Sequence, residues 1–298
     1  MFQERINYDG DISLISKAIC KDYNLGEFVS HKVIQLGYED FNLVLETSVG
    51  KYFVKIFAKF RDLANCQRYI DVMVKMVKSG VSIPKLFKSS KGYLHEIEGL
   101  HLCVMEFIDG DNLYNLDIDI VDVKFLARQA ALINSIDIKP EFVYDSWAIT
   151  SLSKEFSKKS KCLSESDLKL IEPLVSEFAT LDISKLPHCF VHGDILSTNV
   201  MKSDKLFIID FSVSNYYPRV QELAVLACES CYGHLDVMLA EYQKYVKLTS
   251  YELEVLPLYI KLAHAMHLLS ANYEKVVLGN KSEENEYWLK IGRDRLPN

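Results

Sequence analysis

Residues 190–211 read FVHGDILSTNVMKSDKLFIIDF, and they place polar side chains directly after strongly apolar runs. His192, Asp194 and Asn199 follow the first run, and Asp210 ends the second. Carboxylates and carboxamides are costly to bury unless charged or hydrogen-bonding groups meet them. The stretch therefore predicts a polar site supported by two buried strands.

The two apolar runs, about residues 188–192 and 205–210, have the length and composition of short strands. Gly193 permits a sharp turn after the first of them. If the two strands form a small hairpin, the polar side chains that follow them converge. Taken singly, each of these residue types also forms turns, caps or strand ends, but the joint spacing H-G-D-x4-N followed by I-D-F favours a functional site.

The residue types of this stretch suit magnesium and phosphoryl transfer. Mg²⁺ prefers hard oxygen ligands and binds one or two carboxylates together with substrate phosphates. Asn199 and Asp210 are therefore the predicted metal ligands. Asp194 remains to accept a proton from a hydroxyl group, which is the division of roles found in kinases.

The N-terminal part of the chain is rich in β-branched and aromatic residues. After a helix predicted over about 11–24, the strands 29–36, 42–47 and 51–57 are separated by short turns and predict an antiparallel meander. A helix over about 62–79 follows, and then a hairpin around Glu98-Gly99.

Helical periodicity dominates after residue 107. We therefore predict an α+β, two-lobed chain, with a β-rich lobe at 1–107 and a mainly helical lobe at 108–298. The helices predicted for the second lobe cover about 121–136, 165–180, 219–232, 235–247, 250–277 and 283–292.

The first lobe supplies a candidate phosphate-binding lysine. Lys55 in F-V-K-I-F lies on the third predicted strand and shares a face with Phe53 and Phe57. The loop G-Y-E-D-F-N (37–42) is placed to cover phosphates with backbone N–H groups, which makes Tyr38 and Asn42 candidate nucleotide contacts.

Composition excludes several classes of protein. The 298 residues are 49% hydrophobic and 25% charged, as expected for a soluble globular chain. A net charge of −7 disfavours general binding to nucleic acid or anionic membranes. The N-terminus lacks the pattern of a secretory signal, and no apolar run approaches the roughly 20 residues of a membrane helix.

The seven cysteines are odd in number and lack a framework spacing, which predicts reduced thiols in a cytoplasmic protein. Cys228 and Cys231 form one C-x-x-C, which we interpret as small apolar residues one helical turn apart rather than as a redox pair. His264 and His267 are likewise interpreted as core histidines rather than as a metal pair.

The motifs FVKIF, VMEFIDG, FVHGDILSTN, LFIIDF and PRVQELA together resemble the aminoglycoside phosphotransferase and choline kinase superfamily. The resemblance covers nearly the whole chain and implies a protein kinase-like fold. It implies that Asp194 is the catalytic base, that His192 steadies the catalytic loop and that Lys55 binds the α- and β-phosphates. Asn199 and Asp210 correspond to the family's Mg²⁺ ligands.

The segment VMEFIDG is similar to the part of the family that meets the adenine base. Met105 resembles the gatekeeper residue. The resemblance implies that the backbone carbonyl of Glu106 and the N–H of Ile108 contact the adenine edge.

Two positions depart from the family pattern. The family often has a glutamate on the first-lobe helix that pairs with the lysine, and this helix has none. Asp71 is the nearest acidic candidate and Gln67 a polar one. In addition, the family's D-L-A after the metal aspartate is E-L-A here, with Glu222.

The resemblance implies a kinase that transfers the γ-phosphoryl group of ATP, or of GTP, with Mg²⁺ as cofactor. The acceptor is expected to be a hydroxyl of an amino sugar, an amino alcohol or a hydroxy amino acid. The segment GYEDFNLVLET is similar to homoserine kinase-like members. The sequence indicates neither the acceptor nor the oligomeric state.

Two alternatives to this kinase stay open. The missing helix glutamate is compatible with a pseudokinase that binds a nucleotide or small molecule without turnover. His192 and Asp194 could also belong to a hydrolytic metal site, for which His188 is the one further ligand nearby.

Overall fold

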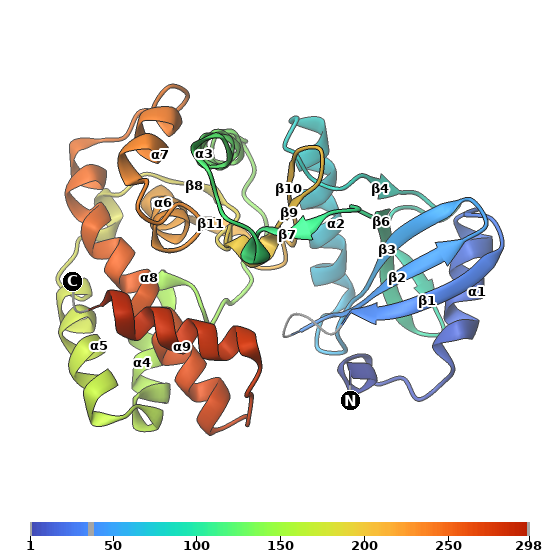
Figure 1. Ribbon diagram of the computed structural model, residues 1–298, viewed down its shortest axis with the longest axis horizontal. Coiled ribbons are helices and arrows are strands. Elements are labelled where there is room, and N and C mark those ends of the chain that lie inside the picture. Colours follow the sequence, from blue (N-terminus) through green and yellow to red (C-terminus); the bar gives the residue numbers. More distant parts are fainter. Residues whose placement is uncertain (1, 35–38, 297–298) are drawn as a thin grey trace. The chain divides into compact units, whose positions relative to one another are not determined.

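The computed structural model describes residues 2–34 and 39–296 of the chain. Contacts divide the chain into two compact units, and neither is continuous in sequence (Figure 1). The first unit contains Met1–Asn112 and Val200–Ser212, and the second contains Leu113–Asn199 and Val213–Asn298. The predicted α+β class is confirmed, but a single boundary near residue 107 does not capture the return of Val200–Ser212 to the first unit.

The first unit is built on an antiparallel sheet with the order β1-β2-β3-β6-β4, and β5 also pairs with β6. The predicted meander and hairpin are both formed. Glu98 and Gly99 adopt φ values of 52° and 77°, which the tight turn between β5 and β6 requires. The strands are β1 (Phe28–Ile34), β2 (Phe41–Thr47), β3 (Gly50–Ile56), β4 (Leu86–Phe87), β5 (His95–Ile97) and β6 (Leu100–Glu106).

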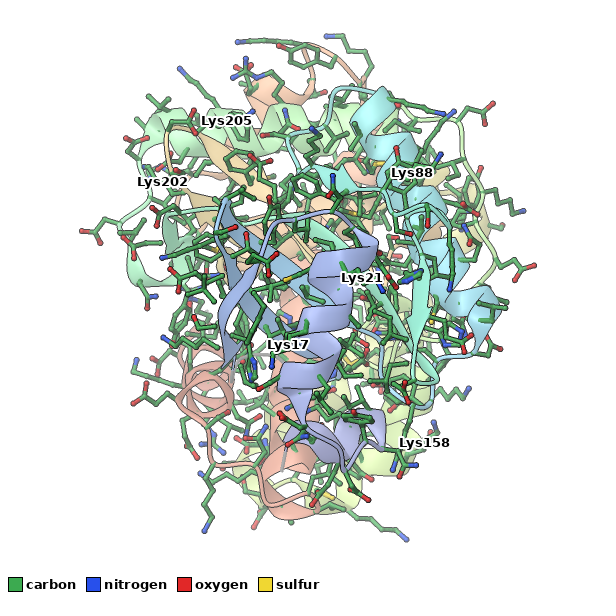
Figure 2. The ribbon with its side chains drawn as sticks, turned by 90° about the vertical axis from the view of Figure 1, so that its right-hand side faces the viewer. Lys17, Lys21, Lys88, Lys158, Lys202 and Lys205 are labelled. Atoms are coloured by element: carbon green, nitrogen blue, oxygen red, sulfur yellow. The ribbon has the colours of Figure 1, made fainter. Side chains whose placement is uncertain are left out.

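Helix α1 (Ile12–Asp22) covers one face of this sheet. Its buried Ile15 and Ile19 belong to a core that includes Val54 and Ile56 of β3. Lys17 and Lys21 are exposed on the side of α1 that faces away from the sheet (Figure 2). Side chains alternate along a strand, so Lys55 points to the opposite face from Val54 and Ile56.

Helix α2 (Leu63–Lys78) begins after Asp62, whose side chain accepts a hydrogen bond from Asn65 N. Tyr69 of α2 packs edge-on against Phe57, and its hydroxyl lies 3.9 Å from Met105 Sδ. The ammonium of Lys55 lies 5.5 Å from the centre of the Tyr69 ring. Helix α2 therefore covers the face of the sheet that carries Lys55.

A second, small sheet completes the first unit. It contains β7 (Asp111–Asn112), β9 (Val200–Lys202) and β10 (Leu206–Ile208) in the order β10-β9-β7. Ser82 ties it to the rest of the unit, because its hydroxyl donates to Leu206 O at 2.7 Å and its carbonyl accepts from Ile208 N at 2.8 Å. These contacts bring the chain up to Asp210 into the first unit.

The hairpin expected between the two apolar strands of the opening stretch is not formed. The first, β8 (His188–Val191), pairs with β11 (Asn215–Pro218), and β10 pairs with β9. Strands β9 and β11, of three and four residues, are the partners of β10 and β8 instead.

The second unit is mainly helical, and its β8–β11 pair packs against α3 and α6. The long helix α8 packs against several of the others, including α5, α6 and α9. Its helices are α3 (Ile120–Asn134), α4 (Leu152–Lys159), α5 (Glu165–Phe178), α6 (Arg219–Cys228), α7 (Leu235–Tyr242), α8 (Ser250–Val276) and α9 (Glu283–Arg295). Short 3₁₀ turns cover Phe2–Ile6, Leu113–Asn115, Ile149–Ser151, Ser160–Cys162, Ile183–Lys185 and Ser197–Asn199.

The helix predicted over 219–232 ends early, at Cys228. Glu229 leaves the helical conformation, with φ −141° and ψ −75°, and its carboxylate is used elsewhere in the unit. Cys228 and Cys231 are buried, and all seven cysteines are free thiols. Within residues 2–34 and 39–296, no helix is both long and apolar enough to cross a membrane.

His264 and His267 lie in the buried part of α8. His267 packs against Trp288, with ring centres 4.6 Å apart, and lies near Trp147. Neither Nδ1 atom has a hydrogen-bond partner in the described part of the chain. Burial, with a smaller contribution from Arg295, lowers the pKa of His264 to about 4; burial, with a contribution from His264, lowers the pKa of His267 to about 3.

These two histidines are expected to make the protein sensitive to acid. Below pH about 6.5 the unfolded chain binds protons that the folded chain excludes, so stability is lost as the pH falls toward 4. Each histidine is expected to lower the free energy of unfolding by about 1.4 kcal/mol per pH unit in this range. Urea unfolding at a series of pH values measures the slope.

The slope is expected to decrease in His264→Gln, and again in the double variant with His267→Gln. Both substitutions also change packing, but packing shifts the whole curve rather than its slope. An unchanged slope in the double variant would contradict the assignment.

Candidate active site

Lys55 is buried and ion-paired within the first unit. Its Nζ lies 2.8 Å from Asp40 Oδ2 and 3.2 Å from Asp210 Oδ2, and only 3% of its side chain is exposed. Burial lowers the pKa of Lys55, but Asp210 and Asp40 outweigh it and hold the pKa well above its ordinary value. The lysine is therefore a fixed cation on the α2 side of the sheet.

Asp210 lies two residues beyond β10 and meets this lysine. It adopts φ 61°, a conformation that residues other than glycine rarely adopt and that functional sites often retain. Ser212 holds it there, because its N–H and its hydroxyl both donate to Asp210 Oδ1, at 3.2 and 2.5 Å. Burial raises the pKa of Asp210, but Lys55 and the Ser212 hydroxyl outweigh it, so the pKa lies well below its ordinary value.

Asp40 is a site residue that the sequence patterns did not indicate. Its Oδ1 accepts hydrogen bonds from Ala58 N and Arg61 Nε, both at 2.9 Å, while its Oδ2 meets Lys55. The sequence does contain one signal for Asp40: it precedes Asn42 by two residues. Because side chains alternate along a strand, Asp40 is expected on the same side as Asn42. Asp71, the sequence candidate for this role, is exposed on α2 and accepts a hydrogen bond from Gln67 Nε2 at 2.8 Å. Asp71 is therefore not the partner of Lys55 in this structure.

Asn42 stands directly opposite Lys55 in the β2–β3 register, so the two side chains share a face. Its Oδ1 is buried and has no hydrogen-bond partner among the residues described. A buried oxygen without a donor is unfavourable unless a ligand or water satisfies it, which fits a place beside a bound molecule. Tyr38, the other loop candidate, lies outside the described residues.

The predicted adenine contacts lie at the end of β6. Met105 is buried, faces Phe53 of β3 and Leu86 of β4 in register, and contacts Tyr69. Glu106 is exposed, and its N–H donates to Lys85 O at 2.8 Å. Ile108 is buried. Their nucleotide contacts stay predictions, but all three residues belong to the unit that contains Lys55 and Asp210.

The catalytic-loop candidates come together in the second unit. Asn199 Nδ2 donates to the Asp194 carboxylate at 2.6 Å and to its backbone carbonyl at 3.0 Å. Asp194 N donates to Nδ1 of His192, which is completely buried. The imidazole therefore fixes the backbone of the loop, and the carboxamide fixes the orientation of the Asp194 carboxylate.

Glu222 of α6 holds the backbone of this loop through two hydrogen bonds. Its two carboxylate oxygens accept the backbone N–H groups of His192 at 3.0 Å and Gly193 at 2.8 Å. Burial raises the pKa of Glu222 to about 7, although these two hydrogen bonds lower it. The glutamate that replaces the family's aspartate thus holds the turn at Gly193, whose φ is 84°.

A second buried carboxylate, Glu229, holds the far end of the loop and was not indicated by the sequence. It accepts from Ser197 N at 2.8 Å, from the Ser197 hydroxyl at 2.6 Å and from the Tyr287 hydroxyl at 2.9 Å. Ser230 donates to Ile195 O at 3.0 Å. Because α6 ends at Cys228, the side chains of Glu229 and Ser230 can both hydrogen-bond to the loop.

Each compact unit by itself carries groups that suit a divalent cation or a phosphate-bearing ligand. Asp210 offers a carboxylate that stays ionised, and Asn199 offers a carboxamide oxygen because its nitrogen is used by Asp194. Lys55 and the unsatisfied Asn42 oxygen lie on the same face of the sheet. Within the first unit, a carboxylate, an ammonium and an unsatisfied amide oxygen are therefore present together.

Comparisons with known proteins agree with this chemistry. The sequence profile of the phosphotransferase enzyme family matches residues 30–251. A homoserine kinase of Methylorubrum populi is 29% identical over 98 residues, which cover 33% of this chain and 30% of that protein. A homoserine kinase of Bartonella henselae is 23% identical over 306 aligned residues, which cover 92% of each chain.

Solved structures share the fold at low sequence identity. An amicoumacin kinase in complex with AMP-PNP, Ca²⁺ and Ami has a TM-score of 0.69 and 16% identity, covering 99% of this chain and 94% of that one. A choline kinase from Streptococcus pneumoniae has a TM-score of 0.65 and 18% identity, covering 96% and 98%. The predicted kinase-like fold is thereby confirmed.

Proposed function

The chain belongs to the phosphotransferase enzyme family, acting on alcohol groups, and we propose that it transfers the γ-phosphoryl group of ATP to the hydroxyl of a small amine-bearing acceptor. The acceptor classes are an amino sugar, an amino alcohol and a hydroxy amino acid. The homoserine kinases among the relatives favour a hydroxy amino acid. The seven free thiols favour the cytoplasm as the place of reaction.

One observation supports the proposal most directly. Lys55 Nζ lies 3.2 Å from Asp210 Oδ2, so the candidate phosphate lysine and a candidate metal ligand meet although 155 residues separate them. The Lys55 side chain is 3% exposed and that of Asp210 is 39% exposed. A buried ammonium is costly to maintain without partners, and such groups cluster where function requires them.

In the proposed mechanism, Asp194 accepts a hydrogen bond from the acceptor hydroxyl and then its proton. Asn199 fixes the Asp194 carboxylate for this step through the 2.6 Å hydrogen bond. Lys55 binds phosphate oxygens, while Asn199 and Asp210 would hold Mg²⁺. When bound, Mg²⁺ supplies neutralisation of the phosphate charge. The contribution of the protein is mainly orientation and electrostatic stabilisation.

The two alternatives have less support. The pseudokinase hypothesis depended on the absence of a helix glutamate that would pair with the lysine. Asp40 supplies a carboxylate to Lys55 at 2.8 Å, so the lysine does not lack an acidic partner. A hydrolytic metal site would require His192 as a ligand, but His192 is completely buried and its Nδ1 accepts the N–H of Asp194.

A coupled ADP-release assay across a panel of amino sugars, amino alcohols and hydroxy amino acids tests the proposal. We expect one class to raise ADP release at least about tenfold above the acceptor-free rate, with turnover in the usual kinase range of about 1–100 s⁻¹. Substituting GTP for ATP in the same assay determines the nucleotide. Nucleotide binding without stimulation by any acceptor would favour the pseudokinase instead.

A further inference from the structure

Lys55 has a carboxylate partner that does not come from a helix. Asp40 lies immediately before β2, and its Oδ2 is 2.8 Å from Lys55 Nζ. Both side chains are only 3% exposed. An ion pair so shielded from water has a geometry that the surrounding protein determines, unlike a surface pair that exchanges partners.

The other oxygen of Asp40 is also occupied. Asp40 Oδ1 accepts from Ala58 N, two residues beyond β3, and from Arg61 Nε, one residue before the cap of α2. Arg61 is itself 7% exposed and pairs with Glu39. The carboxylate is thus fixed on one side by main chain and guanidinium, and it presents its remaining oxygen to the lysine.

The β2–β3 hairpin brings Asp40 and Lys55 together. Asn42 and Lys55 are opposite each other in register, so residues just before β2 and just after β3 lie at the same end of the hairpin. Asp40 and Ala58 are those residues. The position of Lys55 is therefore set by the sheet and its adjoining turns.

We propose that Asp40 is the positioning residue that orients Lys55 toward the nucleotide phosphates, in place of an acidic residue on α2. The inference rests on the proposed function, because it assigns Lys55 to the phosphates. Asp40 keeps the ammonium in one place while Asp210, its second partner, is engaged by metal. The lysine therefore needs no movement of α2 to become correctly placed.

Calorimetric titration with Mg²⁺–AMP-PNP tests this without knowledge of the acceptor. In Asp40→Asn, Lys55 is expected to occupy its binding position in about a tenth of molecules or fewer, so the apparent Kd rises about tenfold or more. Asp40→Glu restores the carboxylate and is expected to recover most of the affinity. Asp71→Asn removes the exposed acid of α2 and is expected to change Kd less than twofold.

A double-mutant cycle with Lys55→Met separates positioning from folding. If Asp40 acts through Lys55, Lys55→Met and the double variant Lys55→Met/Asp40→Asn bind AMP-PNP equally weakly. This comparison remains available if Asp40→Asn alone does not fold, since the double variant removes the buried ammonium together with its carboxylate partner.

Four results would contradict this assignment or the function it rests on. Wild-type affinity in Asp40→Asn, or an equal loss in Asp71→Asn, overturns the positioning role. A further tenfold loss in the double variant also overturns it, because Asp40 would then act independently of Lys55. Unchanged binding in Lys55→Met alone would instead contradict the proposed function, so the two failures are distinguishable.

Discussion

Replacement of Asp194 by asparagine is expected to lower kcat by about 10²- to 10⁴-fold, the usual contribution of a positioned general base. The amide keeps the size of the side chain, but it cannot take a proton from the acceptor hydroxyl. The KM for ATP is expected to change little, since the asparagine oxygen can still accept the hydrogen bond from Asn199 Nδ2, and Lys55 and Asp210 belong to the other compact unit. Steady-state kinetics with the acceptor identified by the ADP-release assay measures both constants.

Asp204→Asn is the matched control for this variant. Asp204 is an exposed aspartate between β9 and β10, so its loss changes the charge equally without touching the catalytic loop. Wild-type turnover in Asp194→Asn would remove Asp194 from the mechanism, whereas a comparable loss in Asp204→Asn would point to a non-specific charge effect.

The second large effect is expected from Asp210→Asn. A neutral amide is a poor substitute for a carboxylate ligand of Mg²⁺. Loss of an outer-shell partner alone typically costs about 10–100-fold in metal affinity, so loss of a ligand is expected to cost more than about 100-fold. The initial rate as a function of Mg²⁺ concentration, at constant ATP, gives the apparent affinity.

The fold is expected to survive this change, because Lys55 keeps Asp40 as an ion-pair partner at 2.8 Å. Thermal unfolding of Asp210→Asn in the absence of metal checks this separately. The same Mg²⁺ dependence in Asp210→Asn and in the wild type would exclude Asp210 as a metal ligand.

The sequence was informative where periodicity extends over many residues. The meander, the β5–β6 hairpin and helix α2 follow from alternating or helical apolar patterns, and the structure contains all of them. Strands β9 and β11 are too short to carry such a pattern. Their partners are determined by tertiary packing, so the pairing of β8 could not be read from local sequence.

The candidate functional residues of the two units divide in the same way. Asp194, Asn199 and Asp210 stand in a dense, recognisable spacing, and local hydrogen bonds join the first two. Asp40 reaches Lys55 from a turn in the first unit, and Glu229 reaches the Ser197 end of the catalytic loop from the end of a helix in the second unit. An acidic residue in either place is common on protein surfaces, so only the three-dimensional structure separates these two from ordinary solvated residues.

The return of Val200–Ser212 to the first unit means that the chain passes from one compact unit to the other three times. No single cut can then yield two intact halves: a fragment ending at Asn112 would lack β9, the strand that pairs with β7, and would also lack Asp210. Gene fusion or fragmentation at that point would separate Asp210 from Lys55 and from the other residues that we propose to bind the nucleotide. Both units must therefore be encoded and expressed as parts of one polypeptide.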